Sequence, residues 1–208
     1  MASTGKRPAD LEIIPRSPHF DLLSAMQGKR YWFANDPVLT HFVNALQSTF
    51  PEGERFFIDA ARDVATRVRE ENLSPQLQSD LKAFIHQEGW HGKQHSLWCD
   101  ALVTLGYVRM DHYVDALKRQ RLWAREHINP MTRLAATAAA EHMTASLVQL
   151  FLRTDLLDQA DRPVADMLAW HALEESEHKA VCFDLYQAAG GGYVRRSLVM
   201  LIEWFDLA

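Results

Sequence analysis

The sequence has 208 residues, of which 48% are hydrophobic and 24% are charged, and its formal net charge is −5. These values are typical of a soluble globular chain that is long enough to bury a substantial core. The acidic balance and the lack of a dense Lys/Arg block give no reason to expect a nucleic-acid partner. The N-terminus lacks the apolar run of a signal peptide, and no stretch is apolar for long enough to span a bilayer. We therefore expect a cytoplasmic protein.

Helix start and stop signals recur along the chain, whereas alternating strand patterns are scarce. Three dipeptides place an N-cap residue before a proline at the first helical position: Asp36-Pro37, Ser74-Pro75 and Asn129-Pro130. Glycines mark expected helix ends at Gly106 and at residues 190–192. These signals predict an all-α chain.

The expected elements can be placed in chain order. Residues 1–18 are expected to be poorly ordered. Helices are predicted over residues 20–27, 36–49, 51–71, 75–105, 111–127, 130–154 and 162–189, and from residue 193 onward. No low-complexity linker separates these helices, so we expect residues 19–208 to form one domain.

The long helices carry polar residues in the middle of stripes that should be buried. Residues three and four positions apart share one helical face. On the helix over 75–105 this stripe is apolar at both ends and holds Glu88, His91 and His95 in its middle. The helix over 162–189 has the same pattern, with a central group of His171, Glu175 and His178.

The other two long helices each add one carboxylate to such a stripe. Glu54 lies on the predicted helix over 51–71, and Glu141 lies among small residues on the helix over 130–154. Burying an unpaired carboxylate costs several kcal/mol, so four carboxylates in one core require a compensating cation. Two divalent metal ions would supply that charge.

The spacing of these residues defines a ligand pattern. Glu88-x-x-His91 and Glu175-x-x-His178 each place a carboxylate and an imidazole one turn apart on one face. In each half of the chain, a lone glutamate precedes the first residue of this motif by 34 residues. Ferritin-like bundles hold two metal ions with this ligand set. We therefore predict a ferritin-like four-helix bundle with additional helices and an internal repeat of helix pairs.

Four segments resemble the family of predicted metal-dependent hydrolases with a ferritin-like core. They are FPEGERFF (50–57), QEGWHGKQH (87–95), AAAEHMTA (138–145) and WHALEESEHKAVCFDLY (170–186). The resemblance covers most of the chain, from about residue 14 to the C-terminus. It implies a two-metal enzyme that hydrolyses its substrate.

The arrangement His171-x-x-x-Glu175-x-x-His178 also resembles a ligand helix of the di-iron p-aminobenzoate N-oxygenases. In those enzymes an extra histidine, one turn before the E-x-x-H motif, binds the metal as a seventh ligand. The resemblance implies seven ligands in this chain: Glu54, Glu88, His91, Glu141, His171, Glu175 and His178. It extends to the ligand pattern alone, so an arylamine substrate is not implied.

Three positions leave alternatives open. His171 is a metal ligand in this interpretation, but it also fits a core position beside a ligand. His95 lies one turn after His91, and we expect it to contact a ligand or the substrate rather than the metal. Glu174 competes with Glu175 for the inward position, and the E-x-x-H spacing favours Glu175. Glu174 is then a further candidate for contact with a ligand or the substrate.

The ligand types limit the metal and the chemistry. Carboxylates and imidazoles without thiolates suit iron best, with manganese and zinc as alternatives. The leading hypothesis from this preference is a di-iron oxidase or monooxygenase that uses O₂, and an electron donor, to oxidise a small apolar substrate. The alternative is a two-metal hydrolase. A third class is non-catalytic metal or oxidant handling by a ferritin-like protein.

The predicted C-terminal helix, residues 193–207, is apolar on most faces. Such a helix is compatible with contact to a membrane surface or to a partner, including a second copy of the chain. Glu203 and Asp206 interrupt the apolar run, which favours packing against the bundle instead.

Overall fold

The computed structural model describes residues 12–153 and 155–207. Apart from one isolated bridge between Phe33 and Ala160, the regular structure in these residues is helical. The helices are α1 (Leu22–Met26), α2 (Pro37–Ala65), η1 (Glu70–Asn72), α3 (Pro75–Thr104), α4 (Met110–His127), α5 (Pro130–Arg153), η2 (Leu157–Gln159), α6 (Arg162–His178), α7 (Val181–Ala188) and α8 (Tyr193–Leu207). The prediction of an all-α helical bundle with additional helices is confirmed.

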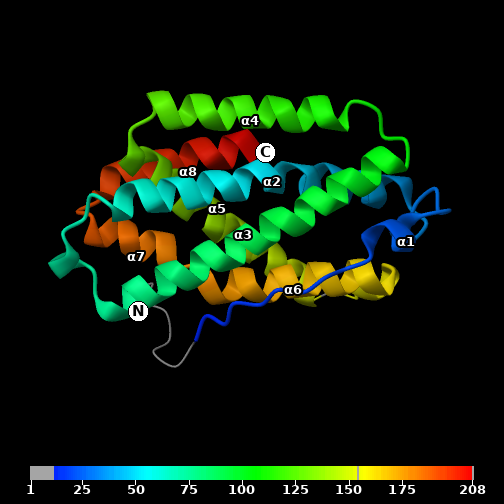
Figure 1. Cartoon of the computed structure of the whole chain (residues 1–208), viewed down its shortest axis with the longest axis horizontal. Coiled ribbons are helices and arrows are strands. Elements are labelled where there is room, and N and C mark those ends of the chain that lie inside the picture. The colour runs from blue at the N-terminus through cyan, green and yellow to red at the C-terminus, as the bar shows by residue number, and fades with distance from the viewer. Residues whose placement is uncertain (1–11, 154, 208) are drawn as a thin grey trace.

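Four helices form the bundle that surrounds the predicted site. α2 packs against α3 and α5, and α6 packs against the same two helices, so the four close into a ring. α4 connects the two helix pairs and lies along the outside of α2, whereas α8 covers α5 (Figure 1). The two pairs, α2 with α3 and α5 with α6, are the two halves of the predicted repeat.

The predicted helix starts have the expected caps. The Asp36 carboxylate accepts a hydrogen bond from the backbone N–H of Leu39 at 2.9 Å, at the start of α2. The Ser74 hydroxyl accepts one from the backbone N–H of Leu77 at 3.1 Å, at the start of α3. Each bond satisfies a backbone donor that the first helical turn leaves unpaired. The predicted starts of α2 and α3 are therefore confirmed.

Three predicted helix boundaries are wrong. The helix expected to run to residue 71 ends at Ala65, and a turn separates it from the short η1. The break expected between residues 49 and 51 is absent, because α2 runs through Pro51. An internal proline costs about 3 kcal/mol, and buried residues on both sides of Pro51, from Ser48 to Glu54, hold the helix in the bundle. Conversely, the helix expected over 162–189 is interrupted after His178, where Lys179 and Ala180 keep right-handed angles and bend the chain.

The core consists of two apolar clusters with a buried polar layer between them along α3. Phe84 belongs to the first cluster, together with Phe57 and Leu185. Trp98 and Leu102, further along the same helix, belong to the second cluster. Between these positions, α3 buries the predicted site residues Glu88, His91 and His95. Burial of the apolar ends at about 25 cal/mol per Å² offsets the cost of the polar middle.

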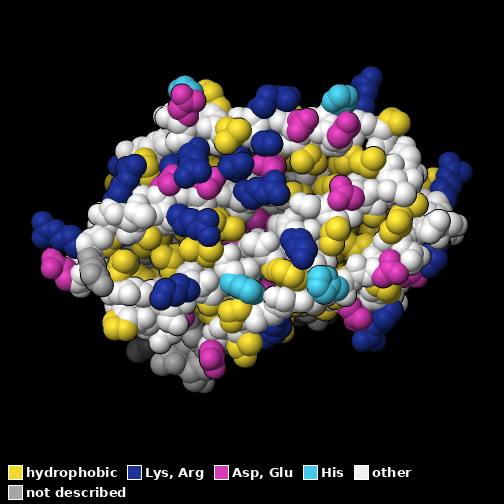
Figure 2. All heavy atoms as spheres, viewed as in Figure 1, with side chains coloured by type: hydrophobic (Ala, Val, Ile, Leu, Met, Phe, Trp, Pro, Cys, Tyr) yellow, Lys and Arg dark blue, Asp and Glu magenta, His cyan; other side chains and the backbone are white. Residues whose placement is uncertain are grey.

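α4 is held mainly by ion pairs, because Ala124 is the buried residue of this helix. Arg121 pairs with Glu52 at 2.8 Å and with Asp59 on α2, and Arg125 pairs with Asp59 at 3.1 Å. Basic and acidic side chains are correspondingly interspersed on this face of the molecule (Figure 2). Isolated surface pairs contribute little, but Glu52 is itself buried, so this network fixes α4 more firmly.

Residues 12–20 form an extended N-terminal strap that passes over α6 and leads into α1 (Figure 1). The indole N–H of Trp90 donates to the carbonyl of Pro18 at 2.8 Å, and the amide of Gln94 donates to the same carbonyl at 3.1 Å. Ile13 is buried in the first apolar cluster. Of the segment that was expected to be poorly ordered, residues 1–11 lie outside the described residues, and residues 12–18 belong to this strap.

The C-terminal helix is only partly covered. Val199 is buried in the first apolar cluster, on the side of α8 that faces α5, whereas Leu201 and Trp204 are exposed. In the part of the chain that the structure describes, no helix combines the length and apolar character needed to traverse a bilayer. Contact of residues 193–207 with a membrane surface or a partner stays a prediction.

Candidate metal centre

The structure brings the seven predicted ligands together between the four bundle helices. Glu54 comes from α2, Glu88 and His91 from α3, Glu141 from α5, and His171, Glu175 and His178 from α6. All seven are buried, and His171, the most exposed of them, retains only 5% of its surface. The continuous α2 and the capped start of α3 place their residues at the same level of the bundle.

The imidazole of His178 faces three carboxylates. Its Nε2 lies 3.0 Å from Glu88 Oε1, 3.4 Å from Glu141 Oε2 and 3.6 Å from Glu175 Oε1. Its Nδ1 lies 2.9 Å from Gln87 Oε1, an amide oxygen that can only accept a hydrogen bond. Nδ1 therefore carries the proton, and in the neutral ring Nε2 directs its lone pair at the carboxylates. In the neutral ring this contact is repulsive, so either a proton on Nε2 or a cation between the groups is needed to stabilise it.

The imidazole of His91 also points one ring nitrogen at the cluster and holds the other with a partner outside it. Its Nδ1 lies 3.4 Å from Glu88 Oε1 and 3.8 Å from Glu175 Oε1. Its Nε2 lies 3.1 Å from Glu174 Oε2, which accepts its hydrogen bond. Glu175 thus faces the cluster, and Glu174 contacts the outer nitrogen of a predicted ligand. This arrangement agrees with the order that the E-x-x-H spacing favours.

His171 and His95 extend the cluster toward α2. His171 Nε2 lies 2.9 Å from Glu175 Oε1, and its Nδ1 lies 3.1 Å from His95 Nε2. His95 Nε2 also lies 3.2 Å from Glu54 Oε1. The ring of Phe50 packs against both imidazoles, with centroid distances of 4.7 and 5.2 Å. His95 therefore contacts Glu54, a predicted ligand, directly. His171 lies between His95 and Glu175 and contacts both.

Many of the polar atoms in this cluster have no hydrogen bond. They include both carboxylate oxygens of Glu54, Glu88 and Glu141, together with His91 Nδ1, His95 Nδ1 and His178 Nε2. A buried polar atom without a partner costs about 1–3 kcal/mol. Four trios of these side chains have ligand atoms within 4.8 Å of one another: Glu54–His95–His171, His91–His171–Glu175, Glu54–Glu88–His91 and Glu88–Glu175–His178. The cluster could therefore hold metal, and bound metal would satisfy the unpaired atoms.

Burial also shifts the pKa values of the cluster. Burial raises the pKa of Glu54 and of Glu141 well above the ordinary value, and neighbouring carboxylates raise both further. Burial opposes protonation of His178, but the nearby Glu141 and Glu175 raise the pKa of this imidazole well above its usual range. Burial and the neighbouring His171 lower the pKa of His95 well below it. Protons and metal ions therefore compete for the same carboxylate-rich cluster.

Three residues near the cluster were not predicted from the sequence. Gln87 orients His178, and the Thr144 hydroxyl donates to Glu175 Oε2 at 2.6 Å. A Cβ atom at Gly92 would lie 3.2 Å from Glu54 Oε2, so the glycine leaves room for that carboxylate. Helical periodicity could place these residues near the stripe, but it does not reveal which atoms they contact.

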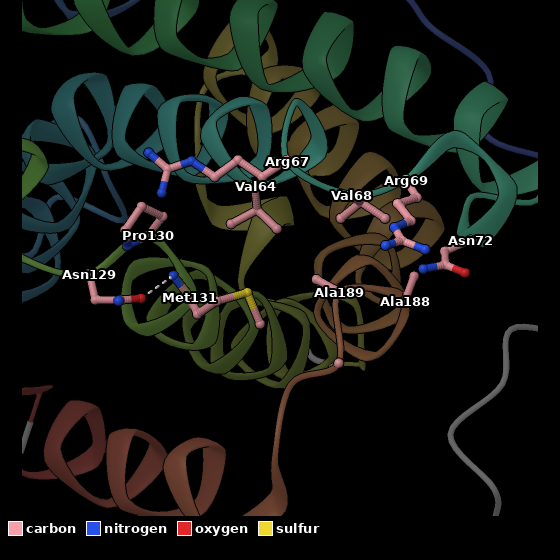
Figure 3. Close-up of a pocket in the computed structure, with 11 residues that line it drawn as sticks. Val64, Arg67, Val68, Arg69, Asn72, Asn129, Pro130, Met131, Ala188 and Ala189 are labelled. Atoms are coloured by element: carbon pink, nitrogen blue, oxygen red, sulfur yellow. Dashed lines mark hydrogen bonds between the residues drawn. The ribbon is translucent and has the colours of Figure 1, made fainter.

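A separate pocket of about 430 Å³ lies elsewhere in the bundle (Figure 3). Its walls come from the end of α2 and the segment after it, the start of α5 and the end of α7; they include Val64, Arg67, Met131 and Ala189. Met131 precedes Glu141 by ten residues on α5, which is about 15 Å along a helix axis. The pocket is therefore not part of the buried cluster.

The fold and the buried cluster define an all-helical protein whose carboxylates and histidines could hold metal. Over residues 14–208 the chain matches a family described as predicted metal-dependent hydrolases, and it belongs to that family. The first resemblance seen in the sequence is thereby confirmed. No curated protein and no solved structure matched the chain. None of the comparisons bears on the resemblance to the N-oxygenases.

Proposed function

We propose that the cluster binds two divalent metal ions. Glu54, Glu88 and His91 would hold one ion, and Glu141, Glu175 and His178 would hold the other. His171 would be an additional ligand of the first ion. The main support for this proposal is that imidazole nitrogens and carboxylate oxygens face one another at 3.0–3.9 Å. Several of these atoms have no hydrogen bond. Two divalent ions would balance the charge of the four carboxylates.

We propose metal-dependent hydrolysis as the reaction. A bound pair of ions supplies a nucleophilic water at neutral pH and polarises the bond to be cleaved. Around the proposed metal centre, the Thr144 hydroxyl holds one oxygen of Glu175. The burial of the cluster limits the access of bulk water. His95 stays a neutral imidazole because its pKa is low, and it lies beside Glu54 at the edge of the cluster. A ring with a lowered pKa is a weak base, so we assign His95 contact with a ligand or the substrate rather than proton uptake.

Activation of O₂ is the second candidate, and the ligand types favour it. Four carboxylates and several imidazoles suit iron, and Cys182, which interacts with three of these carboxylates, is held as a protonated thiol rather than a thiolate. Cys99 and Cys182 are buried free thiols, and burial raises the pKa of Cys99 to about 11 and that of Cys182 well above its usual range. Ligand preference alone ranks this function first, but the family supports hydrolysis. Ferritin-like metal handling ranks third, because His171 suits a fixed centre better than ion transit.

A comparison of metal forms tests this proposal. Zinc-, manganese- and ferrous-loaded proteins would be assayed against a panel of ester, amide and phosphoester substrates, with Glu88→Ala as the inactive control. We expect the zinc or manganese form to hydrolyse members of one substrate class, since hydrolysis needs no change of metal oxidation state. Separately, the anaerobic ferrous protein would be mixed with oxygenated buffer and its absorbance followed.

The opposite pattern of results would contradict hydrolysis and support the activation of O₂. In that case the ferrous protein would develop a new absorption band within seconds of mixing, Glu88→Ala would not, and the zinc form would be inert toward the whole panel.

A further inference from the structure

We propose that Arg16, on the N-terminal strap, is a positioning residue that orients both His91 and His178 for metal binding. This inference rests on the proposed metal centre and adds to it a residue outside the four bundle helices. Arg16 touches neither histidine. Its guanidinium instead contacts two carboxylates. Glu174 holds the outer nitrogen of His91 directly, and Glu177 holds that of His178 through Gln87.

The first connection runs through Glu174. Arg16 Nη1 donates to Glu174 Oε1 at 3.2 Å, and the other oxygen of the same carboxylate accepts from His91 Nε2 at 3.1 Å. The Glu174 side chain is completely buried. Because one oxygen is held by Arg16, the other stays directed at the imidazole, and His91 Nδ1 is turned toward the cluster.

The second connection runs through Glu177 and Gln87. Arg16 Nη2 donates to Glu177 Oε1 at 2.8 Å, and its Nη1 donates to Oε2 at 3.0 Å. Glu177 Oε2 also accepts from Gln87 Nε2 at 2.9 Å. Because its NH₂ group is held by Glu177, the Gln87 amide directs its oxygen at His178 Nδ1, at a distance of 2.9 Å. His178 Nε2 is thereby turned toward the cluster.

The charges explain why an arginine occupies this position. Glu174 and Glu177 are two buried carboxylates next to a cluster that already contains four. Arg16 offers a planar fork of donors, which can engage both carboxylates at once, whereas an ammonium acts as a single point charge. Its hydrogen bonds to Glu177 raise the pKa of the guanidinium further. Both connections are thus ordered by one cation.

The strap supplies the rigidity that this role needs. The carbonyl of Ile14 accepts from Gln87 Nε2 at 3.2 Å, and its backbone N–H donates to Glu177 Oε2 at 3.3 Å. The hydrogen bonds from Trp90 and Gln94 fix Pro18 on α3. Groups that orient metal-binding histidines typically contribute about 10–100-fold to metal affinity. We therefore expect Arg16 to contribute an effect of this size without contacting metal.

Cobalt(II) binding to Arg16→Gln tests the proposal, with Lys29→Gln as the matched control. Lys29 pairs with Asp161, just before α6, and so also ties the N-terminal region to α6, but it contacts no partner of either histidine. Affinity would be measured by chelator competition, and the visible cobalt spectrum would report the ligand geometry. The Arg16 side chain is 30% exposed, so its replacement should leave the helical content unchanged by circular dichroism.

We expect Arg16→Gln to bind cobalt about tenfold more weakly or worse, with an altered spectrum, and Lys29→Gln to match the natural protein. Arg16→Lys keeps the charge but loses the fork, so its affinity should fall between those of Arg16→Gln and the natural protein. An unchanged affinity and spectrum in Arg16→Gln, or an equal loss in Lys29→Gln, would overturn the positioning role alone. Failure of the natural protein to bind cobalt would overturn the metal centre and this inference together.

Discussion

His171→Ala is expected to empty one of the two proposed metal positions and leave the other largely filled. His171 Nε2 lies 2.9 Å from Glu175 and 3.9 Å from Glu54, so it faces two of the proposed ligands at once. The two E-x-x-H motifs remain intact in this variant. The ion bound by Glu141, Glu175 and His178 should therefore be retained.

His95→Ala is the matched comparison, because it removes the neighbouring imidazole of similar burial. His95 contacts Glu54 and His171 through the same nitrogen, and we expect its loss to weaken binding while the metal count stays at two. Elemental analysis of both variants after saturation and desalting measures the difference. The reverse pattern, in which His95 is required and His171 is dispensable, would exchange the roles that we assign to these histidines.

Removal of metal is expected to lower the melting temperature, and the loss should grow as the pH rises above neutrality. Glu54, Glu141 and His178 have pKa values raised well above 4.5 for the carboxyls and 6.5 for the imidazole. A group with a raised pKa in the folded state stabilises the fold at low pH, and this stability is lost as the pH rises through that pKa. Bound metal would replace these protons.

The expected change in melting temperature follows from the linkage between metal binding and folding. Metal at about 100 times its Kd stabilises a protein by about 2.7 kcal/mol, which corresponds to roughly 5–10 °C for a chain of this size. His95, with its lowered pKa, is neutral throughout this pH window and does not oppose the trend. Thermal scans of metal-loaded and chelated protein at several pH values measure the gap.

Glu141→Gln is the control for this interpretation. It removes one of the carboxylates with a raised pKa, so it should stabilise the chelated protein at the upper end of the pH range and destabilise the loaded one. If chelation leaves the melting temperature unchanged at every pH, the carboxylates are not assembled around metal.

The sequence was sufficient to predict the helices and to nominate the clustered residues. Glu88 and His91 were recognised because a polar pair in the middle of an apolar stripe must be buried when the bundle closes. The repeated spacing then nominated Glu54 and Glu141, which single motifs would not distinguish from surface glutamates. Helical periodicity therefore carries information about which residues come together, although it says nothing about metal identity or reaction.

The contacts around the cluster could not be predicted in this way. Gln87 is held by Glu177, which lies 90 residues away in the chain, and Arg16 comes from a segment without helical periodicity. Two of the helix boundaries are predicted wrongly for a related reason. Packing along α2 outweighs the local effect of Pro51. No proline or glycine marks the interruption after His178. Local signals report local preferences, whereas these features depend on tertiary contacts.

Anomalous diffraction from crystals of the metal-loaded protein tests the proposed two-metal centre most directly. Data collected at the absorption edge of the bound metal locate each ion independently of the protein coordinates. We expect two peaks per chain, about 3.5–4 Å apart, between Glu88 and Glu175. A single peak at full occupancy, or peaks outside the buried cluster, would contradict the proposal that these side chains form a two-metal centre.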